Sequence, residues 1–86
     1  MAKKPTTPTQ FDAKHLKAEI MRDAKALGMA ESTADYITNK IVAAVEKWIS
    51  KRSAVTMEDI ERRVAMEAER YNADLAYVYQ NRGKII

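Results

Sequence analysis

Residues 55–64 read VTMEDIERRV, and they contain the clearest helix start in this sequence. Asp59 follows Thr56 at the spacing of a capping box, in which each side chain accepts a hydrogen bond from the other residue's backbone N–H. Apolar residues then recur at helical intervals, at Met57, Ile60, Val64, Ala68 and Tyr71. We therefore predict a helix from Thr56 with one apolar face, and we interpret Glu58, Asp59 and Glu61 as first-turn acids that complement the helix dipole.

Three further helices are predicted on either side of this stretch. Asp12 can cap a first helix, which ends at Gly28. Ser32 can cap a second helix, which runs to about Ser50. Asn72 can cap a last helix, which ends near Gly83. The inward residues that this predicts are Leu16, Ile20, Ala24, Leu27, Ile37, Ile41, Ala44, Val45, Trp48, Leu75, Ala76, Val78 and Tyr79. Short loops of roughly 3–6 residues between capped helices indicate an all-α fold, a compact array of four helices.

The domain organisation follows from composition. The chain has 86 residues, of which 47% are hydrophobic and 31% charged, so residues 11–86 are expected to form one globular domain. Residues 1–10 contain Pro5 and Pro8, which favour an extended arm. Since no stretch approaches the ~20 apolar residues of a membrane span and no apolar signal segment precedes residue 11, we expect a cytoplasmic protein without membrane contact.

Catalysis and metal binding are not expected. There is no cysteine, and the two glycines leave no room for a Gly-rich phosphate loop. The single histidine, His15, lies one helical turn from Asp12 and from Glu19, which is typical of a surface histidine between two carboxylates. We therefore predict that the chain is not an enzyme by itself and has no metal site.

Two charged features are left open at this point. Glu67 falls within the apolar face of the third helix, so it either sits at the edge of that face with its carboxylate in water, or faces a polar pocket or a partner. The first helix carries a basic outer stripe, although the net charge of the chain is only +3. The residues of this basic stripe are Lys14, Lys17, Arg22 and Lys25.

Three segments together resemble a known family. Residues 55–64 resemble the V-T-x-E-x-I-x-x-x-V stretch of the ATP-cone, the allosteric nucleotide-binding domain at the N-terminus of many ribonucleotide reductases. Residues 11–16, FDAKHL, resemble the Phe-Asp-x-x-Lys-Ile opening of its first helix, and residues 71–76 resemble the start of its last helix, with Ala76 and Tyr79 at the family's spacing. Lys3 and Lys4 stand where the family has a Lys-Arg-Asp-Gly hairpin, so the resemblance covers residues 3 to about 82.

The resemblance implies a helical bundle covered by a short β-hairpin, with ATP or dATP bound between the two as an allosteric ligand. Carried over to this sequence, Lys3 and Lys4 would contact phosphates and Phe11 would shape the pocket. His15 would take the position of the family's first-helix lysine, with Lys14 beside it. In the family, the nucleotide changes the oligomeric state of the reductase.

The sequence departs from the family in its first residues. Pro5-Thr6 replaces Asp-Gly of the hairpin, and prolines oppose strand pairing.

Three hypotheses for the function of the chain follow, in this order. The first is a regulatory ATP- or dATP-binding module that acts on a reductase or another protein subunit. The second is a helical protein–protein interaction module that uses no nucleotide, a homo-oligomer included. The third is a nucleic-acid-binding domain that uses the basic stripe; it comes last because no base-reading element is visible.

Overall fold

The computed structural model describes residues 11–81, which form four α-helices and no strand. The helices are α1 (Ala13–Ala26), α2 (Glu31–Ser50), α3 (Met57–Glu69) and α4 (Ala73–Asn81). The predicted all-α, four-helix array is thus confirmed. The extended arm predicted for residues 1–10 lies outside the described residues, as does the expected helix end near Gly83. None of the described helices is long and apolar enough to cross a membrane.

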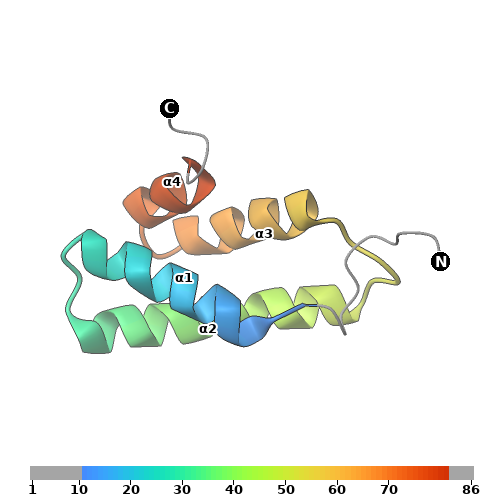
Figure 1. Cartoon of the computed structure of the whole chain (residues 1–86), viewed down its shortest axis with the longest axis horizontal. Coiled ribbons are helices and arrows are strands. Elements are labelled where there is room, and N and C mark those ends of the chain that lie inside the picture. The colour runs from blue at the N-terminus through green and yellow to red at the C-terminus, as the bar shows by residue number, and fades with distance from the viewer. Residues whose placement is uncertain (1–10, 82–86) are drawn as a thin grey trace.

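Each helix packs on its neighbour in the chain, and α1 also packs on α4 (Figure 1). The helix α2 is the longest, at 20 residues, and α1 and α3 both run back along it. Within residues 11–81, the backbones of α1 and α3 do not come as close to one another as those of the packed pairs. This separation leaves room for a hollow between their N-terminal ends.

All four helices contribute to one hydrophobic core, whose largest fully buried apolar side chains are Ile20, Ile41, Ile49, Leu75, Val45, Val55 and Val64. Three residues predicted to lie inward are exposed instead, namely Leu27, Met57 and Tyr71. Each of them lies at a helix end or in a turn, beyond the part of the helix that faces the core. Trp48, which was predicted as a core residue, is only partly buried at the core's edge.

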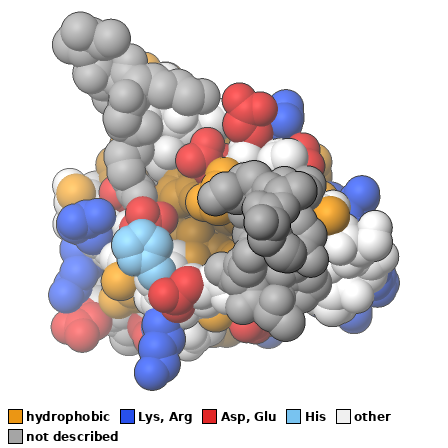
Figure 2. All heavy atoms as spheres, turned by 45° about the vertical axis from the view of Figure 1, so that its right-hand side comes forward, with side chains coloured by type: hydrophobic (Ala, Val, Ile, Leu, Met, Phe, Trp, Pro, Cys, Tyr) orange, Lys and Arg blue, Asp and Glu red, His pale blue; other side chains and the backbone are white. Residues whose placement is uncertain are grey.

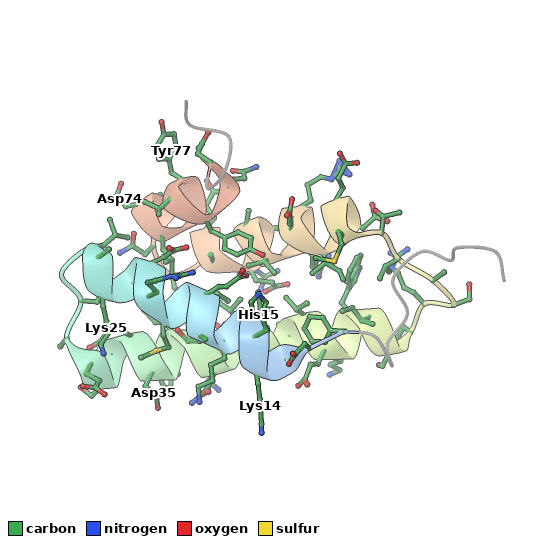
Figure 3. All side chains as sticks on the ribbon, viewed as in Figure 1. Lys14, His15, Lys25, Asp35, Asp74 and Tyr77 are labelled. Atoms are coloured by element: carbon green, nitrogen blue, oxygen red, sulfur yellow. The ribbon has the colours of Figure 1, made fainter. Side chains whose placement is uncertain are left out.

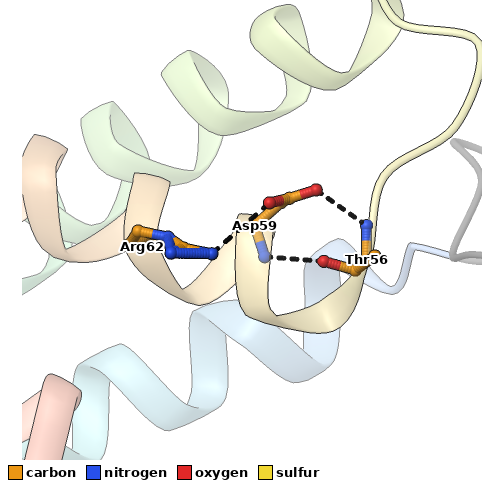
Figure 4. A network of polar contacts seen from close by, with 3 residues as sticks. All are labelled: Thr56, Asp59 and Arg62. Carbon is orange, nitrogen blue, oxygen red and sulfur yellow. Dashed lines mark hydrogen bonds and ion pairs between the residues drawn. The ribbon is translucent and has the colours of Figure 1, made fainter.

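Side chains cap three of the four helices as predicted. The His15 N–H donates to Asp12 Oδ1 at 3.1 Å, and the Leu75 N–H donates to Asn72 Oδ1 at 3.0 Å. The capping box of α3 is complete (Figure 4): the Asp59 N–H donates to Thr56 Oγ1 at 3.0 Å, and the Thr56 N–H donates to Asp59 Oδ2 at 3.2 Å. These bonds satisfy N–H groups that have no partner within the helix.

The predicted cap at Ser32 is wrong. Helix α2 begins at Glu31, and the residue before it, Ala30, makes no capping hydrogen bond through its side chain. The backbone is already extended at Ala30, so the helix starts before Ser32 is reached. Asp35 has other partners, because it accepts a hydrogen bond from Asn39 Nδ2 at 3.3 Å and pairs with Lys17 Nζ at 3.6 Å.

Glu67 is buried, so the interpretation that its carboxylate reaches water at the edge of the apolar face is wrong. Its side chain is 7% exposed, and its carboxylate lies 3.1 Å from Arg63 Nη2 and 3.6 Å from Arg70 Nε. A buried carboxylate is tolerated when cationic donors pair with it. Both arginines are within one turn of Glu67 on the same chain segment, which explains how the charge fits inside an apolar face.

Candidate functional site

A hollow of about 240 Å³ lies where the N-terminal ends of α1 and α3 meet α4. We refer to it as the hollow. Figure 2 shows it as an apolar recess beside the histidine, with carboxylates around it. It is lined by Phe11, Asp12, His15, Leu16, Glu19, Met57, Ile60 and Tyr79. Its walls thus combine an apolar floor with a polar edge from the first turns of α1.

Helix caps place the residues of two of these walls. Because Asp12 caps α1, Phe11 lies just before the helix and His15 lies in its first turn. The capping box fixes the first turn of α3, which sets Met57 and Ile60 at the opposite wall. Tyr79 of α4, which is 9% exposed, closes the hollow from a third side.

The polar edge is acidic. His15 Nε2 lies 3.1 Å from Glu19 Oε2. A second, smaller hollow of about 140 Å³ adjoins the first, shares His15 and Glu19 with it, and adds Glu61 and Gln80. Within the described part of the chain, no lysine or arginine lines either hollow. This arrangement suits a flat apolar group whose N–H donors meet carboxylates, whereas a phosphate has no cationic partner among these lining residues.

The structure brings together two of the five residues that the resemblance assigns to nucleotide binding. Phe11 and His15 both line the hollow. Lys14 is exposed and points away from α3 and α4 (Figure 3), so it does not line the hollow. Lys3 and Lys4 lie outside the described residues.

Sequence reasoning missed six of the eight lining residues as members of the site, among them Asp12, which was predicted only as a helix cap, and Leu16, which was predicted only as an inward residue. Ile60 and Tyr79 were assigned to the core and Met57 to an inward face, although all three belong to or adjoin the motifs that carry the resemblance. Glu19 was recognised only as a neighbour of His15. The spacing of Asp12, His15 and Glu19 along one face of α1 is a signal that could have identified this wall.

Residues 11–81 contain no group of three or more His, Cys, Asp or Glu side chains arranged to hold a metal ion. No protein-family model matches the sequence, and comparisons with curated proteins and with solved structures found no significant match.

Proposed function

We propose that this chain is a regulatory ATP- or dATP-binding module of the ATP-cone type, with the base seated in the hollow. One observation carries the proposal. The three motifs of the resemblance are far apart in the sequence, and each contributes to the walls of the hollow: Phe11 and Leu16 belong to the first, Ile60 to the second and Tyr79 to the third. Motif residues that meet at one recess support a shared binding role.

The hollow suits the base better than the whole nucleotide. Drug-sized ligands occupy pockets of about 300–1,000 Å³, and the hollow measures about 240 Å³. Its apolar floor can hold the ring, and the carboxylates of Asp12 and Glu19 can accept hydrogen bonds from an exocyclic amine. The same carboxylates repel phosphates, so the phosphates would extend away from them to Lys3 and Lys4, which precede Phe11 in the chain.

Such a module acts without chemistry of its own. A nucleotide that binds one assembly state better than another shifts the equilibrium between them by the difference in affinity. The expected partner is a reductase subunit, another protein subunit or a second copy of the chain.

The test is a titration of the labelled protein with ATP, dATP and adenosine, followed by two-dimensional amide NMR. We expect shifts at Phe11, His15, Ile60 and Tyr79 that saturate below about 1 mM, which corresponds to roughly 4 kcal/mol of binding free energy. Phe11→Ala should weaken binding of all three ligands about tenfold or more, because it removes an apolar wall. Lys14→Ala is the matched control and should change the affinity less than about twofold.

A double variant, Lys3→Ala with Lys4→Ala, separates the phosphates from the base. It should weaken the binding of ATP and dATP, because their phosphates lose cationic partners, and it should leave the binding of adenosine unchanged. An unmoved spectrum at several millimolar nucleotide would exclude the proposal.

A second function, docking of a basic protein segment, is favoured by the acidic edge of the hollow. Asp12, Glu19 and Glu61 surround it, and Met57 at its wall is 58% exposed. An apolar recess with carboxylates at its edge complements a helix that carries apolar and basic residues. Binding of such a peptide, with no response to nucleotide, would support this function.

Nucleic-acid binding through the basic stripe ranks last, since Lys17 of that stripe already pairs with Asp35.

A further inference from the structure

A second feature lies on α2 and α3 and shares no lining residue with the hollow. Trp48 is partly buried at the edge of the core, and two guanidinium groups lie against its ring. The Arg52 Cζ is 4.7 Å from the ring centroid and the Arg63 Cζ is 5.5 Å from it. Distances below about 6 Å are those of cation–π contacts.

A groove runs past this tryptophan. Two adjoining recesses of about 420 Å³ and 300 Å³ share Trp48 and Lys51, and together they follow the C-terminal part of α2 and the facing side of α3. We call this surface the basic groove, because its charged lining residues are Lys47, Lys51, Arg52, Arg63, Arg70 and a single carboxylate, Glu67. Five cations against one carboxylate leave an excess of four positive charges, more than the +3 of the whole chain.

Contacts with other side chains of the protein hold two arginines of the basic groove, Arg63 and Arg70, in place. The buried carboxylate of Glu67 pairs with Arg63 and Arg70, and the ring of Trp48 supports Arg63 from another side. The Nε of Arg63 is buried and has no hydrogen-bond partner among the described atoms. Cationic groups that are already ordered lose little conformational entropy when an anion binds, so the basic groove is prepared for an anionic partner.

From this arrangement we propose that the basic groove binds an acidic segment of a protein partner, whose carboxylates pair with the cations beside Trp48. A protein partner is favoured over a nucleic acid because bases bind by stacking on open aromatic faces. Trp48 already carries two guanidinium groups against its ring.

The size of the surface also fits a short acidic segment. Lys47 and Lys51 lie one turn apart, and Arg63 and Arg70 lie two turns apart on the facing segment, which is about 10 Å at 1.5 Å per residue. Carboxylates on two turns of a partner helix have the same spacing.

The test uses the fluorescence of Trp48, the only tryptophan of the chain, which reports directly on the basic groove. The probe is a glutamate-rich synthetic peptide, and a glutamine-rich peptide of the same length is its neutral counterpart. We expect the glutamate peptide to change the emission in a saturable way, with an affinity that falls as salt is added. The glutamine peptide should leave the emission unchanged.

Two double variants with reversed charges test whether the peptide binds at the basic groove. Lys47→Glu with Lys51→Glu places like charge against the peptide and should weaken binding at least about tenfold. Both lysines are exposed, so the fold should be retained, which circular dichroism checks. Lys14→Glu with Lys25→Glu changes the net charge equally on exposed positions of α1 and should alter the affinity less than about twofold.

Three outcomes would overturn the proposal. Equal weakening by both double variants would mean that only net charge attracts the peptide. Tighter binding of a single-stranded oligodeoxythymidylate than of the glutamate peptide would assign the basic groove to nucleic acid. An unchanged Trp48 emission at saturating peptide would place the contact elsewhere.

Discussion

Glu67 shows how a single side chain links the core to the surface of this molecule. Its carboxylate is buried in the apolar face of α3, yet both of its arginine partners reach the surface, at 29% exposure for Arg63 and 66% for Arg70. A buried carboxylate that loses its donors is costly, whereas an apolar side chain of similar volume can fill the same space without donors. We therefore expect the charge of Glu67 to contribute more to the arrangement of the arginines in the basic groove than to the stability of the fold.

Two substitutions separate these roles. Glu67→Ala should lower the free energy of unfolding by about 1–3 kcal/mol, because it removes two ion pairs and leaves a cavity. Glu67→Met, which fills the space, should cost less than Glu67→Ala, because both arginine partners reach the surface and can be solvated there. Urea unfolding measures both, and Glu69→Ala at an exposed position of α3 should stay within about 0.5 kcal/mol of the wild type. Equal losses for alanine and methionine would show that the ion pairs, and not the filled volume, stabilise this site.

At the scale of whole elements, the connection from α1 to α2 depends on one glycine. Gly28 has a φ of +87°, in the left-handed region that glycine adopts without strain. The Gly28 N–H donates to the Lys25 carbonyl at 2.9 Å and the Met29 N–H to the Ala24 carbonyl at 3.2 Å. These two bonds form a Schellman motif, which ends α1 and turns the chain towards α2.

Gly28→Ala should therefore destabilise the protein by about 1–2 kcal/mol, the cost of a left-handed conformation for a residue with a Cβ. No atom lies within 4 Å of the added Cβ, so the loss comes from the backbone alone. Gly28→Asn should cost less, because asparagine tolerates this region better. Thermal unfolding monitored by circular dichroism gives the order of the three proteins, and an alanine variant as stable as the wild type would refute this role for the glycine.

The start of α3 should respond to acid. The hydrogen bond from the Thr56 N–H, followed by the Thr56 hydroxyl and the charge of Arg62 (3.5 Å away, Figure 4), holds the pKa of the Asp59 carboxyl below its usual value. A pKa that is lower in the folded state means that the ionised carboxylate stabilises the fold above the unfolded-state pKa. This contribution is lost as the pH falls through the folded-state pKa.

We accordingly expect Asp59→Ala to be less stable than the wild type at pH 7, and the difference should shrink as the pH falls below about 4, the usual range for aspartate. Urea unfolding at several pH values measures the difference. A difference that stays constant down to strongly acidic pH would show that the charge of Asp59 does not contribute.

At the scale of the whole molecule, the sequence predicted what is local and missed what depends on how helices meet. Capping by Asp12, Thr56 and Asn72 was predictable because each cap bonds within its own helix turn. The depth of Glu67 and of Trp48 was not, because it depends on the angle at which α2 and α3 face each other. Periodicity assigns a residue to a face but does not say how far the neighbouring helix covers that face.

The residues of the candidate site were likewise predicted only in part. The resemblance led to Phe11 and His15, which do line the hollow, and to Lys14, which does not. Ile60 and Tyr79 were assigned to the core, since a wall of a recess and a core position have the same apolar signal. The basic groove escaped notice because its cations come from residues 47–52 and from residues 63–70, and each helix alone shows only an ordinary charged face.

The order in which the helices pack has a consequence for the kinetics of folding. Three of the four packed pairs, α1 with α2, α2 with α3 and α3 with α4, are neighbours in the chain, and only α1 with α4 joins distant segments (Figure 1). Most native contacts therefore form by closing short loops, which costs little entropy before the contacts are gained. Helical domains of such low contact order refold in microseconds to milliseconds. We expect the α1–α2 and α3–α4 hairpins to form early and the contact between α1 and α4, which joins distant segments, to form last.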